Sequence, residues 1–121
     1  MTSFPRPTSG FLGQYQEYAS NLTDAPETYH LAVGMTVMAA VLEGRAHIPF
    51  GAVDIRPNLY SCLLGESSLD RKSYSMSIGL DRLLHQFEGL NLLPNEFSPE
   101  RLFEKLTEKP KGLLVWPEFG A

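Results

Sequence analysis

The sequence predicts an α/β domain in which N-terminal helices precede strands of a parallel sheet. Three observations predict this class. Apolar residues recur at helical spacing in the first third of the chain and again after residue 75. Two mainly apolar runs, 59–65 and 113–116, have the composition of buried strands. Helical patterns lie between these two runs, which is the order expected of parallel strands joined by helices.

The composition is that of a globular chain long enough for one domain. Its 121 residues are 43% apolar and 20% charged, which suffices for a core and argues against a disordered chain. The net charge of −4 gives no basic footprint of the kind expected for a stand-alone nucleic-acid binder. The single cysteine, Cys62, allows no internal disulfide, and the most apolar run is shorter than the about 20 residues that span a bilayer. We therefore expect a cytoplasmic protein with no membrane partner.

The first third of the chain is predicted to be helical. Residues 1–9 contain two prolines and are expected to form an irregular lead-in. The stretch 11–22 has apolar residues at helical spacing. Residues 24–27 then offer a cap, a first-turn proline and a first-turn acid for a second helix. That helix, 29–42, is apolar on nearly every face, so we expect it to be buried, and Gly44 is expected to end it.

Shorter elements follow. The stretch 46–55 predicts two short strands around a turn at Gly51. A helix with one apolar face is predicted over 76–87, and a loop after it. A further helix is predicted from Ser98, with a cap, a proline and an acid in its first turn, up to Pro110. Two long strands make a poor sheet, so we expect this chain to be a fragment of a longer protein.

The stretch "GESSLDRKS" has the residue types of a phosphate-binding loop. Such a loop follows a buried strand and needs a tight turn, a lysine for the outer phosphates and a hydroxyl for magnesium. Gly65 is predicted to stand at the strand end, and Ser67 and Ser68 are small and hydroxylated. Lys72 and Ser73 are predicted at the start of the next helix, where free N–H groups favour anions.

The spacing leaves a second interpretation open. Gly65 lies seven residues before Lys72, whereas the usual pattern places the first glycine six before the lysine, and Arg71 occupies the second glycine's position. The alternative is a surface loop with basic residues at a helix start. Because adjacent cations at a helix N-terminus oppose its dipole, an incoming anion would explain them.

Glu118 follows the second apolar run, 113–116. P-loop ATPases place an acidic residue at the end of a neighbouring strand, where it holds the magnesium's waters or polarises the attacking water. A solvated surface glutamate is the alternative. The chain order, with the phosphate loop first and the acidic strand later, favours the ATPase interpretation.

Three stretches together resemble a known family. They are "GFLGQYQEYASNLTDAPETYHLAVGMTVMAAVLEGR", "IRPNLYSCLLGESSLDRKS" and "FSPERLFEKLTEKPKGLLVWPEFGA". They are similar to the P-loop ATPase domains of phage and mobile-element primase–helicase proteins. The resemblance extends from about Gly10 and is most specific from Asn58 to Ser73. It implies that the helices are followed by part of a RecA-like parallel sheet. Residues 10–57 would form a helical segment with short strands, and 58–121 a partial nucleotide-binding core from the phosphate loop to the acidic strand.

The resemblance also implies roles for individual residues. Lys72 would contact the outer phosphates of ATP, Ser73 would ligate Mg²⁺, and Glu118 would be the catalytic acidic-strand residue. DNA would be a partner through the full-length protein, in replication or helicase work, and RecA-like motors assemble into rings. The remaining nucleotide-binding positions would be Gly65, Ser67, Ser68 and Arg71.

Two departures leave an alternative function open. Pro117 stands where such strands often carry an aspartate, and Ser68 stands where a glycine is frequent. The alternative is a degenerate, non-catalytic module that binds a nucleotide or another protein. A small enzyme complete in these residues is not expected, because the sequence pairs no nucleophile with a base.

Overall fold

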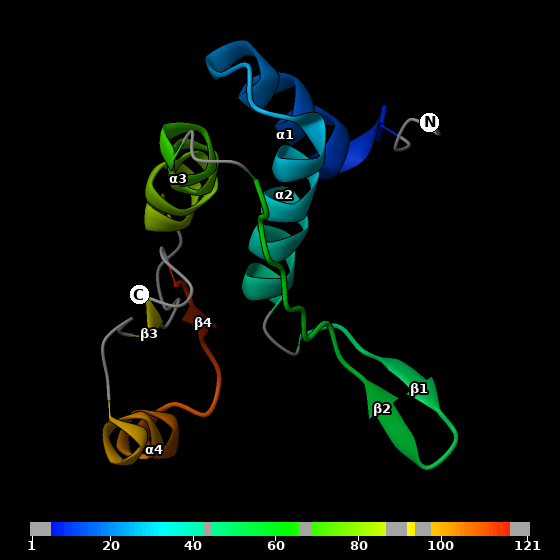
Figure 1. The fold of residues 1–121 in the computed structure, drawn as a ribbon. Helices are drawn as coiled ribbons and strands as arrows, with labels where there is room; N and C mark the ends of the chain where they lie inside the picture. Colours follow the sequence, from blue (N-terminus) through cyan, green and yellow to red (C-terminus); the bar gives the residue numbers. More distant parts are fainter. Residues whose placement is uncertain (1–5, 43–44, 66–68, 87–91, 94–97, 117–121) are drawn as a thin grey trace. The chain divides into compact units, whose positions relative to one another are not determined.

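The computed structural model describes residues 6–42, 45–65, 69–86, 92–93 and 98–116. Their fold is mixed α/β, as predicted, and its parts are shown in Figure 1. The elements are helices α1 (Gly10–Leu22), α2 (Glu27–Leu42), α3 (Leu69–Ser77) and α4 (Pro99–Glu108), the π-helix η1 (Ile78–Leu83), the 3-10 helix η2 (Leu84–Gln86), and strands β1 (Ile48–Phe50), β2 (Val53–Ile55), β3 (Leu92–Leu93) and β4 (Leu113–Leu114).

The chain divides into two compact units. We call the first the helical unit; it consists of residues 1–39 and 58–86 and contains α1, most of α2, α3, η1 and η2. We call the second the small-sheet unit; it consists of residues 40–57 and 87–121 and contains the four short strands and α4.

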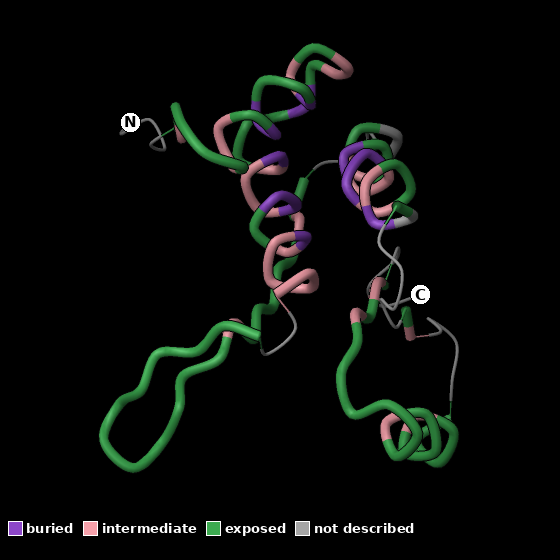
Figure 2. Tube along the Cα trace, turned by 180° about the vertical axis from the view of Figure 1, so that it is seen from behind, coloured by how far each residue is buried: buried purple, intermediate pink, exposed green. Residues whose placement is uncertain are grey.

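The core of the helical unit lies where α1, α2 and the α3–η1 segment meet, and Figure 2 shows its buried positions. Two glycines permit this close packing. A Cβ atom on Gly79 would lie 3.0 Å from Val37 Cγ2 and 3.1 Å from the Tyr15 hydroxyl, and one on Gly34 would lie 2.8 Å from the Tyr15 ring. The buried apolar side chains of this core are Tyr15, Ala19, Ala25, Val33, Val37, Ile78 and Leu84.

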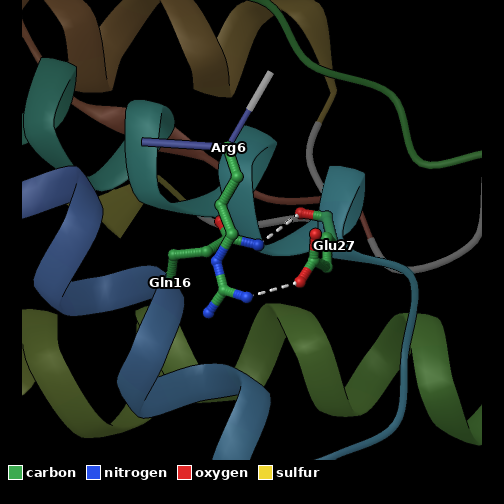
Figure 3. Close-up of polar contacts among 3 residues, drawn as sticks. All are labelled: Arg6, Gln16 and Glu27. Carbon is green, nitrogen blue, oxygen red and sulfur yellow. Dashed lines mark hydrogen bonds and ion pairs between the residues drawn. The ribbon is translucent and has the colours of Figure 1, made fainter. Parts of the chain in front are cut away.

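Polar contacts fix the start of α2 against α1. The side-chain amide of Gln16 donates to the main-chain carbonyl of Glu27 over 3.0 Å. The guanidinium of Arg6 donates to the Glu27 carboxylate over 2.9 Å (Figure 3). Because the Gln16 side chain is buried, its bond to the Glu27 main-chain carbonyl matters more than the exposed ion pair does.

Both predicted N-terminal helices form, but the burial predicted for α2 is wrong. It ends at Leu42, as predicted, and begins at Glu27, two residues before the predicted start; Gly44 lies outside the described residues. Only one side is buried, by His30, Val33, Gly34 and Val37, while Met35 is exposed. The reason is that α1 and η1 contact one side of the helix, so its remaining apolar residues are left half-buried.

The strand predicted over 59–65 does not form. These residues have no regular secondary structure, Tyr60 is 99% exposed, and Cys62, expected to be buried, is also exposed. The segment instead attaches to α2 through side chains. The Tyr29 hydroxyl donates to the Leu64 carbonyl over 2.6 Å, and the hydroxyls of Thr36 and Ser61 lie 3.0 Å apart.

These two contacts show that the segment is extended. Three extended residues, from 61 to 64, span about 10 Å. The seven helical residues from 36 back to 29 also span about 10 Å. The segment therefore runs antiparallel to α2, as the green trace beside α2 shows in Figure 1. The segment is extended like a strand, but it pairs with no other strand among the described residues.

The helix predicted over 76–87 begins earlier and is not a regular α-helix. It starts at Leu69, changes to a π-helix at Ile78 and ends with a 3-10 turn at Gln86. The π-helix places Ile78 and Gly79 in the core, two positions outside the apolar stripe predicted from α-helical spacing. Gly89, the expected stop, lies outside the described residues.

The hairpin of the small-sheet unit matches its prediction. Strands β1 and β2 pair antiparallel, and Ile48 lies opposite Ile55. Gly51 has a φ of 64° in the turn, a left-handed conformation that glycine adopts without steric cost.

The rest of the small-sheet unit differs in part from the sequence prediction. Helix α4 begins as predicted, with the Ser98 hydroxyl accepting from the Arg101 N–H over 3.3 Å. Its apolar side was expected to be buried, but Phe103 is 74% exposed. The parallel pair joins β4 to β3, which lies in a predicted loop, and not to the segment 59–65. The predicted parallel arrangement is thus present on a small scale with a different partner.

His30 is a buried histidine in the helical unit's core. It is fully buried, and neither ring nitrogen has a hydrogen-bond partner among the residues that the structure describes. Burial lowers the pKa of His30 from its ordinary value of 6.5, and the nearby Glu27 carboxylate opposes this shift. The folded chain therefore holds this imidazole neutral at pH values where the unfolded chain protonates it.

This difference predicts a pH-dependent stability. Above about pH 6.5 both states carry a neutral His30 and the full stability is present; below it the unfolded state gains a proton first. The free energy of unfolding should fall with decreasing pH by at most about 1.4 kcal/mol per pH unit. Urea unfolding between about pH 5.5 and 8 measures this slope.

The matched control is His30→Leu. It retains the other two histidines, so the difference in slope between the two proteins isolates His30. Equal slopes in the two proteins would show that His30 titrates in the folded state as it does in the unfolded state.

Candidate phosphate-binding site

The structure brings together the two ends of the predicted phosphate loop. The Lys72 ammonium donates to the Gly65 carbonyl over 2.9 Å. The preceding carbonyl, that of Leu64, is held by the Tyr29 hydroxyl. Ser67 and Ser68 lie outside the described residues.

Gly65 is closely approached by side chains. A Cβ atom there would collide with the Tyr29 hydroxyl and would lie 3.6 Å from Lys72 Cδ. A larger residue would therefore displace the tyrosine, the lysine or the loop. The glycine at this position leaves room for the Tyr29 hydroxyl to reach the Leu64 carbonyl.

Arg71 has a partner that the sequence did not indicate. Its guanidinium lies 2.9 Å from the Asp24 carboxylate, in the turn that joins α1 to α2. Both side chains are more than half exposed, so the pair contributes at most about 1 kcal/mol. Arg71 and Lys72 thus both have internal partners, and their presence near a helix start does not by itself require a bound anion.

The helix start lies three residues before the predicted position. Helix α3 begins at Leu69, which makes Lys72 its fourth residue and Ser73 its fifth. The N–H groups of the first three helical residues have no partner within the helix, so the free donors among the described residues extend from Leu69 to Arg71. Ser73 follows these donors instead of standing among them.

A shallow depression opens beside α3. It has a volume of about 500 Å³. Arg71 and Ser73 were predicted site residues; Lys72 is not among the residues around this depression. The sequence analysis missed the other three, although Ser77 follows Ser73, and Tyr74 follows Arg71, at helical spacing. The lining residues are Thr23, Arg71, Ser73, Tyr74 and Ser77.

The remaining predicted groups are only partly described. Glu118 lies outside the described residues. Among the residues that are described, no three histidine, cysteine, aspartate or glutamate side chains gather as metal ligands. Ser73, in the lining of the depression, is the described candidate for magnesium.

Within the described ranges, no helix is both long and apolar enough to cross a membrane.

Comparisons with known proteins do not assign the chain to a family. No family model, curated protein or solved structure matches it. The resemblance to P-loop ATPase domains stays a prediction, and the function is argued below from the contacts of the site.

The exposure of Cys62 gives a direct test of the segment 59–65. Because Cys62 is the single cysteine, a thiol reagent reports on this segment alone. We expect the folded protein to react nearly as fast as the urea-unfolded chain does. A thiol buried in a core strand would instead react at least about 10³-fold more slowly, because global unfolding is needed to expose it. Such protection would contradict the exposed segment.

Proposed function

We propose that the segment 65–73 binds the phosphate groups of ATP. The contact between the Lys72 ammonium and the Gly65 carbonyl carries this proposal, because it places a lysine against the first residue of the loop. The lysine of a phosphate loop occupies such a position. The close approach at Gly65 and the free N–H groups from Leu69 onward support the same reading.

A nucleotide phosphate can replace the carbonyl as the partner of Lys72. The carbonyl is neutral, whereas a phosphate oxygen carries a negative charge, so the phosphate adds a Coulomb attraction to the Lys72 ammonium that the carbonyl lacks. The lysine lies at an exposed contact, so exchange requires no opening of the core. The observed bond is then the resting arrangement of the site without nucleotide.

The wider proposal is a P-loop ATPase segment that acts on DNA within a longer protein. Ser73 would ligate magnesium, and Glu118 would polarise the attacking water. Lys72 and the N-terminal N–H groups of α3 would stabilise the charge that develops on the terminal phosphate. The ring assembly and the link to phage or mobile-element replication come from the resemblance alone.

A second candidate function is a non-catalytic module that binds another protein. The β1–β2 hairpin favours it. The register places Ile48 opposite Ile55 and Phe50 opposite Val53, so all four apolar side chains lie on one face. Each of them is more than half exposed. A hydrophobic face of this kind is typical of an interaction surface.

Titration calorimetry with magnesium–ATP and ADP tests the first proposal. Lys72→Ala should weaken binding by about 2 kcal/mol, or about 30-fold, because a charged hydrogen-bond partner of the phosphate is lost. Lys109→Ala is the matched control, since Lys109 is an exposed lysine in the small-sheet unit. It should bind like the wild type.

Circular dichroism establishes that the variants are folded. Equal nucleotide affinity of the wild type and Lys72→Ala would remove Lys72 from the site. Absence of binding by the folded wild type would contradict the proposal and favour the second function.

A further inference from the structure

The depression beside α3 combines one guanidinium with four hydroxyl groups. Arg71 provides the guanidinium, and the other lining residues each carry a hydroxyl. An arginine guanidinium pairs with phosphate through charge-assisted hydrogen bonds, and a hydroxyl whose proton is free can donate a further one. All the lining residues belong to the helical unit, so the depression lies within one compact body.

The existing hydrogen bonds leave a donor available in this depression. The Thr23 hydroxyl accepts from the Ala25 N–H over 3.2 Å, so its own proton can go to a ligand. The Ser77 hydroxyl donates to the Tyr74 carbonyl over 2.9 Å, so its remaining capacity is to accept. The Thr23 hydroxyl can therefore donate to a phosphate, whereas the Ser77 hydroxyl has no proton left for one.

Asp24 competes with any anion for Arg71. Its carboxylate stands 2.9 Å from the guanidinium and next in sequence to Thr23. The pair is exposed and therefore weak, so a phosphate with a larger charge can displace the carboxylate. While Asp24 remains paired, the depression carries little net positive charge.

We propose that Arg71 binds a phosphate group of the nucleotide in this depression, and that Asp24 is the internal anion which that phosphate displaces. The inference rests on the proposed function, because its ligand is the same nucleotide. It adds that affinity is limited by an acidic residue outside the loop, and that Thr23 contributes a hydroxyl to the site.

The test compares affinities for ATP and inorganic pyrophosphate in low salt. Asp24→Asn retains the size of the side chain and removes the competing charge, so both ligands should bind about two- to fivefold more tightly. Arg71→Gln should bind them about tenfold more weakly. The gain in Asp24→Asn should shrink in high salt, because the competing pair is exposed.

Asp81→Asn is the matched control for Asp24→Asn. Asp81 is an exposed aspartate of the same unit, on η1, and its replacement changes net charge by the same amount. Tighter binding in both variants would be a general charge effect and would overturn the inference. Unchanged affinity in folded Asp24→Asn, or no binding by wild type and Asp24→Asn alike, would also overturn it.

The affinities of the Asp24 and Arg71 variants test the inference independently of the Lys72→Ala variant, which tests the proposed function. If Lys72→Ala loses affinity and Asp24→Asn behaves as the wild type, the loop binds phosphate and the inference fails. If Asp24→Asn gains and Arg71→Gln loses affinity while Lys72→Ala has no effect, the inference holds and the role of Lys72 fails.

Discussion

The close packing of α1, α2 and η1 around Tyr15 is the constraint on which the helical unit depends. It favours glycine at 34 and 79, because a Cβ atom at 34 would collide with the Tyr15 ring and one at 79 would collide with Val33. This packing fixes where α3 begins relative to α2. It thereby sets the position of Lys72 opposite Gly65 and of Arg71 opposite Asp24. The candidate site is thus a consequence of contacts between small and aromatic residues some distance along the helices.

The site is electrostatically balanced without a ligand. Lys72 bonds to a neutral carbonyl, and Arg71 pairs with a carboxylate, so each cation has a partner that a phosphate can replace. The two replacements differ in cost, because displacing a carboxylate also separates two opposite charges. A nucleotide would therefore meet less resistance at Lys72 than at Arg71.

The sequence predicted correctly those features that neighbouring residues determine. The cap at Ser98, the turn at Gly51 and the end of α2 all depend on residues within a few positions, and each agrees with the structure. Neighbouring residues do not determine whether 59–65 forms a strand, because a strand needs a pairing partner elsewhere in the chain. The Arg71–Asp24 pair and the depression beside α3 likewise depend on long-range packing. Sequence spacing identified Arg71 and Ser73, but not the Thr23 that lies across from them.

The most direct test is to locate the nucleotide on the chain. Backbone amide signals of the isotope-labelled protein, followed by NMR during addition of ATP with magnesium, report every residue at once. Phosphate binding at the proposed site predicts that the largest shifts occur between Gly65 and Ser77, with a smaller group around Thr23 and Asp24. Shifts confined to the β1–β2 hairpin or α4, or no shifts at saturating ATP in the folded protein, would contradict it.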